Sequence, residues 1–387
     1  MSAPKLLIVT TVPQTLATIL RDQPRFLSQQ FDVTLATSPG DEVAAVARNE
    51  QRPVELVPMA RGVNPIADLT SIARMVRLIR RLRPDAVHAY TPKAGLVTMV
   101  AAALCRVPVR IFTFTGVMFP FHSGFKRWLL IWLDRLITSF ATCVVPEGEG
   151  VKRELLKFAI TNKPLEVIGH GNIAGVDTDF FDPYSGGVEE ASERLAVQLG
   201  LGVDDRIFCF IGRLSREKGL FELAQAFLTL PRSARLLIVG ALDERAPIDA
   251  HALSILDHPR IHRLGFHNDV RPALAASDVL VLPSYREGFP NVMLQAAAMR
   301  LPVIATDICG CNEFVVPGVN GWLVEPRDPE ALAAAMREAL ALPADALKAM
   351  GEAGRRRVKE RHERRAFWDS LRRFYEAELG PRTCRTT

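Results

Sequence analysis

Residues 279–295 read Val-Leu-Val-Leu-Pro-Ser-Tyr-Arg-Glu-Gly-Phe-Pro-Asn-Val-Met-Leu-Gln. The stretch joins a short, mostly apolar run at 279–284 to a polar loop, and then to a helix whose first turn Pro290 suits. A strand that is apolar on both sides indicates a parallel sheet covered on both faces. Ligands collect at the carboxyl ends of the strands of such a sheet, so we expect a binding site in the loop.

The same alternation of apolar runs and helical patterns extends in both directions from this stretch. Helical patterns such as 66–82 and 126–140 lie between the runs. The pattern predicts an α/β protein with two doubly wound parallel-sheet domains in tandem. The predicted strands are 6–11, 32–37, 54–59, 86–90, 110–115, 143–146 and 165–168 in the first half, and 207–212, 235–240, 261–265, 279–284, 302–306 and 322–324 in the second.

A change of composition separates the two halves. Residues 183–187, Pro-Tyr-Ser-Gly-Gly, break the pattern and precede a charged helix at 189–199. We therefore predict an N-terminal domain at 1–185, a C-terminal domain at 186–360, and a terminal helix and tail at 361–387. Apolar residues recur at helical spacing in that last segment, so we expect it to pack back on the N-terminal domain; they are Phe367, Trp368, Leu371 and Phe374.

Composition excludes several classes of protein. The 387 residues are 48% hydrophobic and 24% charged, which is typical of a globular protein. The net charge of +5 is mild, and the basic residues fall into helix-like stretches that also carry apolar residues, so we expect no nucleic-acid partner. An anionic ligand or a membrane surface accounts for this charge equally well.

No metal, cofactor or export signal is expected. The six cysteines include no C-x-x-C pair, and no further His or Cys stands at ligand spacing from Cys309 and Cys311. The chain shows no signal-peptide pattern and no apolar run of the ~18–20 residues that span a membrane. A reducing, cytoplasmic location follows as the expectation.

Two strand ends in the second half carry groups suited to a diphosphate. Arg213 and Lys218 follow the predicted strand 207–212, and a guanidinium fork beside an ammonium fits two phosphate groups. The helix that follows Pro290 presents backbone amides and the positive end of its dipole. Glu287 is expected to project into the cleft just before that helix. Asn291 and Gln295 are four residues apart and share one helix face.

Residues 210–325 resemble the donor domain of glycosyltransferase family 4, a retaining family with the GT-B fold. The resemblance implies two Rossmann-like domains that face a central cleft. The residues that carry it are Gly212-Arg213 with Lys218-Gly219, the run 237–240 that ends at Gly240, Gly265-Phe266, the run 283–290, the run 302–306 and the run 318–321.

Carried over onto this chain, the resemblance assigns a role to each of these residues. Arg213 and Lys218 would bind the donor diphosphate, and Glu287 would contact the transferred sugar; these three are the predicted catalytic residues. The sugar would leave and arrive on one face, with the diphosphate accepting the proton and no metal required. The further donor-binding residues are Gly212, Gly240, Gly265, Phe266, Gly288, Phe289, Pro290, Asn291, Val292 and Gln295.

One position departs from the family pattern. The family has a second glutamate eight residues after the first, and that glutamate binds the ribose hydroxyls; here the position is Gln295. A neutral acceptor in place of a charged one would cost about 1 kcal/mol of donor binding. The family favours a UDP-hexose or UDP-N-acetylhexosamine as the donor.

The first half resembles transferases that extend lipid-linked sugars in capsule and O-antigen assembly. The matching runs are 84–95, 111–116, 147–151 and 169–172. They imply a polyprenyl-diphosphate-linked saccharide as the acceptor, within surface polysaccharide (capsule, O-antigen or exopolysaccharide) biosynthesis. Lys93 is either a contact for the acceptor phosphate or a solvated side chain, and His122 and His170 are either substitutes for a missing cleft histidine or structural. The predicted acceptor-side residues are Thr11, Lys93, Thr115, Gly116, His122, His170 and Asn172.

Residues 119–133 combine aromatic, apolar and basic side chains. This is the pattern of a segment that lies on an anionic leaflet, which predicts a peripheral contact with the inner face of the cytoplasmic membrane. An ordinary buried helix is the alternative, and the basic helix at 74–83 could add to the attraction. Two other functions remain open: a catalytically weak sugar-nucleotide-binding protein, favoured by Gln295, and a nucleotide-sugar epimerase of the same fold. A two-lobed solute-binding protein would require export.

Overall fold

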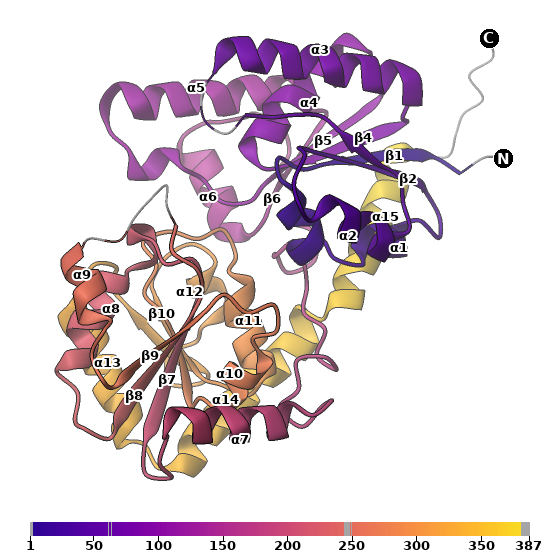
Figure 1. Ribbon diagram of the computed structural model, residues 1–387. Coiled ribbons are helices and arrows are strands. Elements are labelled where there is room, and N and C mark those ends of the chain that lie inside the picture. The colour runs from indigo at the N-terminus through magenta and orange to yellow at the C-terminus, as the bar shows by residue number, and fades with distance from the viewer. Residues whose placement is uncertain (1–2, 61, 63, 244–247, 249, 381–387) are drawn as a thin grey trace. The chain divides into compact units, whose positions relative to one another are not determined.

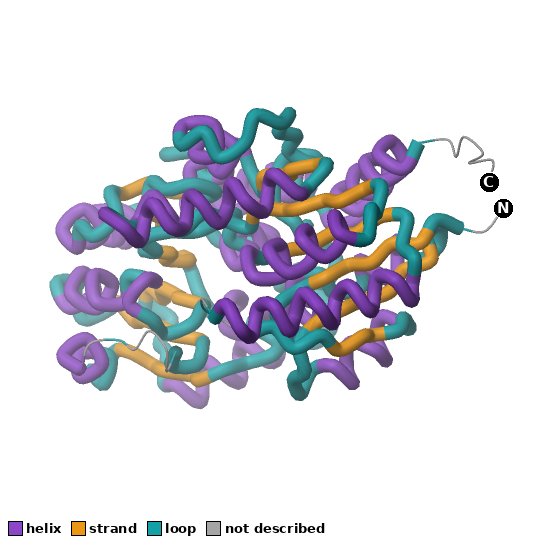
Figure 2. The backbone as a smooth tube through the Cα atoms, turned by 90° about the horizontal axis from the view of Figure 1, so that it is seen from above, coloured by secondary structure: helices purple, strands orange, loops and turns teal. Residues whose placement is uncertain are grey.

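Two compact units make up the computed structural model, which describes residues 3–60, 62, 64–243, 248 and 250–380. The first unit comprises Met1–Gly175 and Arg365–Thr387, and the second comprises Val176–Arg364. Each unit contains one six-stranded parallel sheet between helices (Figures 1 and 2). The predicted α/β class with two Rossmann-like domains is confirmed.

The first sheet has the strand order β3-β2-β1-β4-β5-β6. The order changes direction between β1 and β4, and this is the switch point at which doubly wound sheets bind ligands. The strands are β1 Lys5–Val9, β2 Asp32–Thr37, β3 Val54–Leu56, β4 Ala86–Tyr90, β5 Val109–Phe114 and β6 Cys143–Pro146.

Two hydrophobic cores cover the faces of this sheet. Leu7 and Val9 point to one face and Leu6 and Ile8 to the other, because side chains alternate along a strand. The first core is completed by α3 Pro65–Leu82, α4 Pro92–Leu104, α5 Gly124–Phe140 and α6 Glu149–Lys157. The second core is completed by α1 Gln23–Leu27, α2 Val43–Glu50 and the terminal helix α15 Arg364–Leu379.

The second sheet repeats this arrangement with the order β12-β11-β10-β7-β8-β9. Its strands are β7 Arg206–Ile211, β8 Ala234–Val239, β9 Ile261–Gly265, β10 Val279–Leu282, β11 Val303–Thr306 and β12 Gly321–Val324. Its helices are α7 Val188–Leu199, α8 Leu220–Leu228, α9 Ala250–Ile255, α10 Arg271–Ala275, α11 Asn291–Ala298, α12 Cys311–Phe314, α13 Pro329–Ala341 and α14 Ala344–Arg361.

One predicted strand is wrong. Residues 165–168 form no strand, and Leu165 makes only an isolated bridge to Val144 of β6. Pro164 stands just before it and has no N–H to donate, and the chain turns away at Gly169, where φ is +61°. The other twelve predicted strands occur, with ends shifted by up to three residues.

The observed unit boundaries lie at 175/176 and 364/365, whereas the composition break predicted 185/186 and 360/361. The buried guanidinium of Arg355 decides the first boundary. It donates hydrogen bonds to the carbonyls of Thr178 (3.0 Å) and Phe181 (2.9 Å) and pairs with Asp182 (2.6 Å), so residues 176–182 belong to the second unit. Glycine and proline mark a loop, but these contacts determine which unit holds it.

The terminal helix α15 packs in the first unit. Phe367, Trp368, Leu371, Phe374 and Tyr375 are buried in the core that contains Leu6 and Ile8. The part of the predicted tail at 381–387 lies outside the described residues.

Asp134 on α5 gives a testable pH dependence. It is buried, and it forms no hydrogen bond or ion pair within the described part of the chain. Burial raises its pKa to about 7, so folding takes up a proton and the free energy of unfolding falls as pH rises from about 4 to 7. We expect Asp134→Asn to stabilise the protein at pH 8, by at most about 4 kcal/mol, with little change at pH 4. Urea unfolding at the two pH values measures this, with the exposed Asp32→Asn as the control. An equal effect at both pH values would contradict it.

Candidate active site

An ion pair joins two loops at the carboxyl edge of the second sheet. Lys218 ends the short 3-10 helix Arg216–Lys218 after β7, and Glu287 lies between β10 and α11. The Lys218 Nζ is 2.6 Å from Glu287 Oε1, and the side chains are 20% and 12% exposed. The strands β7 and β10 are neighbours in the sheet, which brings two residues 69 positions apart into contact.

Further contacts fix the same two loops. The Tyr285 N–H donates to the carbonyl of Glu217 (2.9 Å), and the Arg286 guanidinium pairs with the Glu217 carboxylate (2.5 Å). The Tyr285 hydroxyl donates to Glu222 on α8 (2.6 Å), and burial together with that carboxylate raises the pKa of Tyr285. The loop that carries Glu287 is therefore held at several points and does not depend on the Lys218 pair alone.

Arg213, the second predicted phosphate ligand, is exposed and also paired. Its Nη1 is 2.6 Å from Asp243 Oδ2, in the segment after β8. Asp243 was not predicted, although its place after a strand end was a usable signal. An exposed pair of this kind contributes roughly 0–1 kcal/mol, so the predicted diphosphate would displace the carboxylate at little cost.

The start of α11 lies beside this cluster. The helix runs Asn291–Ala298 and Pro290 is its N-cap, one residue earlier than the first-turn position expected. The Phe289 side chain is buried against His362 (ring centroids 5.1 Å apart), so Phe289 offers a ligand only its backbone. Gly288, Asn291, Val292 and Gln295 are partly exposed.

Backbone hydrogen bonds link the glycines at the neighbouring strand ends to the adjacent strands. Gly212 donates its N–H to Val239 (2.9 Å), and Gly240 donates to Gly265 (2.8 Å). Phe266, expected to border the base, follows Gly265 with its ring exposed. The structure thus gathers the predicted donor residues of β7, β8, β9 and β10 along one sheet edge.

In the first unit, Thr11 lies at the switch point. Its Oγ1 is 2.6 Å from Thr91 Oγ1 and accepts a hydrogen bond from the N–H of Ala94 in the first turn of α4 (3.1 Å). Lys93 is neither solvated nor an unpaired cation, because its ammonium contacts both carboxylate oxygens of Asp68 on α3 (2.6 and 2.7 Å). A phosphate would have to compete with Asp68 for it, and this role of Lys93 remains a prediction.

The other predicted acceptor-side residues differ in exposure. Thr115 and Gly116 are partly exposed after β5, His122 is partly exposed beside α5, and His170 is exposed. Asn172 is buried, and its Oδ1 accepts hydrogen bonds from the N–H groups of Ala174 (2.9 Å) and Gly175 (2.8 Å). The Asn172 side chain therefore shapes the turn at the end of the first unit.

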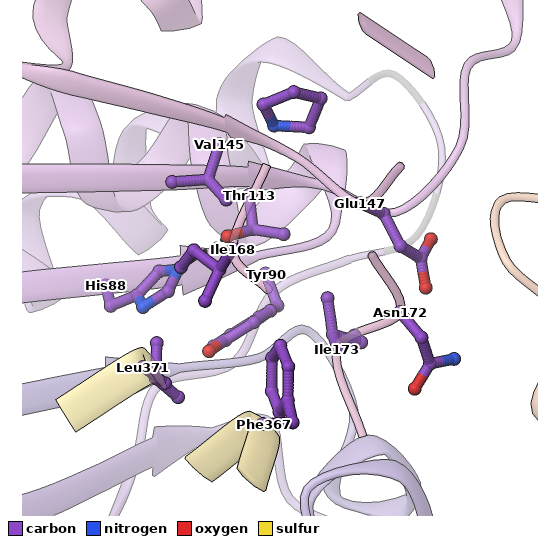
Figure 3. Close-up of a pocket in the computed structure, with 11 residues that line it drawn as sticks. His88, Tyr90, Thr113, Val145, Glu147, Ile168, Asn172, Ile173, Phe367 and Leu371 are labelled. Carbon is purple, nitrogen blue, oxygen red and sulfur yellow. Dashed lines mark hydrogen bonds between the residues drawn. The ribbon is translucent and has the colours of Figure 1, made fainter. Parts of the chain in front are cut away.

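A small cavity of about 10 Å³ lies at the same edge of the first sheet (Figure 3). Glu147 and Asn172 lie at one end of it, and Phe367 of α15 lines another side. The cavity has room for about one water and is too small for a sugar.

Next to this cavity lies a buried polar chain that was not predicted. His88 Nδ1 is 2.6 Å from the Tyr375 hydroxyl and Nε2 is 2.6 Å from Thr113 Oγ1. Burial lowers the pKa of His88 to about 3, so the imidazole is neutral. We interpret the chain as structural, since it ties α15 to β4 and β5.

The chain matches two models of glycosyltransferase domains. "Glycosyl transferase 4-like domain" covers residues 17–171 and "Glycosyl transferases group 1" covers residues 192–357. The chain belongs to the glycosyltransferase family that these two models describe. Each match falls within one unit, in agreement with the resemblance read from residues 210–325.

Two relatives of this glycosyltransferase span most of its length. It is 28% identical over 382 residues to the capsular polysaccharide biosynthesis glycosyltransferase CapM of Staphylococcus aureus, covering 97% of each chain. It is 26% identical to the Escherichia coli UDP-Gal:alpha-D-GlcNAc-diphosphoundecaprenol alpha-1,3-galactosyltransferase, covering 78% of each. Anabaena HepE in complex with UDP-glucose matches its fold with a TM-score of 0.82 at 19% identity, covering 96% of this chain and 99% of HepE. The fold is GT-B.

The glycosyltransferase shows no cluster of three or more His, Cys, Asp or Glu side chains placed to hold a metal within its described residues. Cys311 is buried, which raises the pKa of its thiol and keeps it protonated. Metal independence remains a prediction for the reaction itself.

Gly240 gives a test of the donor edge. Its φ is +149°, and a Cβ there would lie 1.8 Å from the Gly212 carbonyl oxygen, so the ends of β7 and β8 would have to separate. We expect Gly240→Ala to weaken UDP binding at least tenfold and to lower the Tm. Gly200→Ala, at the end of α7, is the matched control, because its φ is +64° but no atom lies within 4 Å, so it costs only about 1–2 kcal/mol of backbone strain. Calorimetry with UDP measures both, and similar affinities would show that the contact between Gly240 and Gly212 does not shape the UDP site.

Proposed function

We propose that this glycosyltransferase moves a hexose or an N-acetylhexosamine from a UDP-sugar to a polyprenyl-diphosphate-linked saccharide, with retention of configuration. The product would enter a surface polysaccharide: a capsule, an O-antigen or an exopolysaccharide. The observation that carries the proposal is the arrangement of Arg213, Lys218 and Glu287 beside the N-terminus of α11. The names of CapM and of the galactosyltransferase support the polysaccharide and the lipid-linked acceptor.

The two cations would bind the diphosphate. Arg213 exchanges Asp243 for one phosphate, and Lys218 shifts from Glu287 toward the other. The N–H groups at the start of α11 add donors and the positive end of the helix dipole. These groups stabilise the negative charge that grows on the leaving diphosphate, and so take the part that a metal ion plays in other transferases.

Glu287 would then be released to the sugar. Its carboxylate accepts hydrogen bonds from sugar hydroxyls and orients the ring, while Lys218 follows the phosphate. The chain contributes position and charge rather than a covalent intermediate. The acceptor hydroxyl attacks from the face that the diphosphate leaves, and a diphosphate oxygen takes its proton.

The acceptor would be presented at the inner face of the cytoplasmic membrane. No helix among the described residues is long and apolar enough to cross a bilayer. We therefore propose a peripheral enzyme, and we expect the acceptor diphosphate to meet the carboxyl edge of the first sheet near Thr11 and Thr115.

The test measures nucleotide release from a panel of UDP- and GDP-sugars, with and without a lipid-diphosphate saccharide. Acceptor-dependent release of UDP, unchanged by EDTA and yielding the retained anomer by NMR, would support the proposal. Release without an acceptor would indicate an epimerase. Binding of UDP-sugar without release under any condition would indicate a sugar-nucleotide-binding protein, in which Gln295 marks lost activity. Glu287→Ala is the inactive reference.

A further inference from the structure

Two helices of the first unit expose large aromatic and apolar side chains. The helices α3, α4 and α5 lie side by side over one face of the first sheet (Figure 1). On α5 the side chains of Phe125, Trp128 and Trp132 are 73%, 59% and 48% exposed. They recur at three- and four-residue spacing, so they share one face of the helix. Phe125 and Trp128 stack on each other, with ring centroids 5.6 Å apart.

Other large apolar side chains of this unit are also exposed. Phe121, just before the helix, is exposed, and so are Ile66 and Leu69 in the first turns of α3. The alternative expectation, that α5 is an ordinary buried helix, is wrong for these side chains. The opposite face of α5 packs on the core through Ile137 and the partly buried Leu130.

The charges on the two helices are sorted by sign. Each helix has one carboxylate, Asp68 on α3 and Asp134 on α5, and each is only 8% exposed. Asp68 is also neutralised by Lys93. The exposed ionisable side chains of α3 and α5 are therefore all basic: Arg74, Arg77, Arg80, Arg81, Lys126 and Arg135.

Only one of these cations meets a carboxylate from another element in the described structure. Arg81 pairs with Glu55 of β3 at 2.6 Å. The remaining surface joins exposed aromatic rings to positive charge and offers no carboxylate of its own.

We propose that the exposed faces of α3 and α5 form a membrane-docking surface whose partner is an anionic phospholipid bilayer. Trp128 and Trp132 would lie at the level of the headgroups, where an aromatic ring with a polar N–H is favoured. Arg74 and Arg77 would meet the lipid phosphates, and Phe125 would reach the acyl boundary. The proposed docking surface is inferred from the exposure and charge of these side chains. Its purpose, to bring the enzyme to a lipid-linked acceptor, rests on the proposed function.

A second copy of the chain fits this surface poorly. A twofold contact places the same patch on both sides, so the arginines of α3 would face one another with no carboxylate between them. Protein interfaces also deplete charge at their centre, whereas here the exposed Lys126 follows Phe125 directly on the same helix. An anionic bilayer satisfies the aromatic and the cationic side chains together.

The test uses the full chain without nucleotide, mixed with phosphatidylcholine vesicles that contain or lack phosphatidylglycerol. We expect co-sedimentation only with the anionic vesicles, and release at high salt. The chain has four tryptophans, of which Trp322 and Trp368 are buried. A blue shift of the emission on binding, with quenching by brominated lipid, would therefore report insertion of α5.

Two variants separate the parts of the surface. Trp128→Ala/Trp132→Ala is expected to lower vesicle affinity roughly tenfold and to abolish the emission shift. Arg74→Ala/Arg77→Ala is expected to lower affinity about tenfold or more on anionic vesicles and to flatten the salt dependence.

The matched control is Arg194→Ala/Lys348→Ala, which removes two exposed cations of the second unit and should change nothing. Equal binding to neutral and anionic vesicles, or loss of binding in the control alone, would overturn the proposal. A change of sedimentation coefficient in the tryptophan variant without vesicles would overturn it in favour of a protein interface. Glu287→Ala should bind vesicles normally, so a failed vesicle test and a failed transferase test are distinguishable.

Discussion

Lys218→Ala is expected to lower kcat by about 10²–10³, with a smaller change in KM. The ammonium contacts Glu287 at 2.6 Å, and in the proposed mechanism it then stabilises the charge on the leaving diphosphate, so it would have two tasks in turn. The second task grows toward the transition state, which is why kcat falls more than affinity. Loss of the first task leaves the Glu287 carboxylate without its cation, although Tyr285 and Arg286 still hold the loop.

Arg216→Ala is the control for this variant. Arg216 lies in the same short helix as Lys218, and its side chain is exposed. Activity within about twofold of the parent protein is expected, because an exposed cation that does not pair with Glu287 adds little. Steady-state rates with saturating donor and acceptor measure both variants. An equal loss in the two would show that general positive potential matters and that Lys218 has no specific role.

Arg355→Met is expected to destabilise the second unit by about 3–5 kcal/mol, the range for breaking a buried ion pair. The guanidinium is buried on α14 and bonds to the carbonyls of Thr178 and Phe181 and to the carboxylate of Asp182. Methionine fills the space but leaves the two carbonyl oxygens without this donor, while Asp182 keeps its pair with Arg300 at 3.1 Å. The linker at 176–182 should then detach from the second unit and become sensitive to protease.

Arg356→Met is the matched control. Arg356 is the next residue on α14, and it is exposed. A change within about 0.5 kcal/mol is expected there. Denaturant unfolding and limited proteolysis followed by mass spectrometry measure both variants. If Arg355→Met left the stability unchanged, the linker would be held by other contacts, such as the Arg364–Asp177 pair and the Val176–Glu363 bridge.

The sheet could be predicted because its signal is local. A strand that is covered on both faces must be apolar at every position, whatever its place in the sheet. Val279–Leu282 is such a strand. The family motifs are local as well, since Gly265-Phe266 and the run 283–290 are contiguous. Residues 165–168 resembled a strand, but Pro164 before them and the turn at Gly169 after them limit the pairing to one bridge between Leu165 and Val144.

The sequence could not predict which charged side chains pair with one another. Lys218 and Glu287 are 69 residues apart, Arg213 and Asp243 are 30 apart, and Lys93 and Asp68 are 25 apart. Strand order decides which loops meet, because a parallel sheet places the carboxyl ends of remote strands along one edge. The sequence could predict these cations as phosphate ligands, but it could not show that each of them already forms an ion pair with a carboxylate.

The sequence by itself determined the fold class and the family, and it named the residues that lie along the carboxyl edge of the second sheet, because each depends on short runs of adjacent residues. The tertiary structure alone decided the domain boundary, the partners of the cations and the exposed face of α5. The linker at 176–182 belongs to the second unit because Arg355, 173 positions beyond Asp182, binds it. The aromatic residues of 119–133 suited either a core or a surface. In the structure Phe119 is buried in the core, whereas the packing of Ile137 against the first sheet leaves Phe125, Trp128 and Trp132 on the outer face of α5.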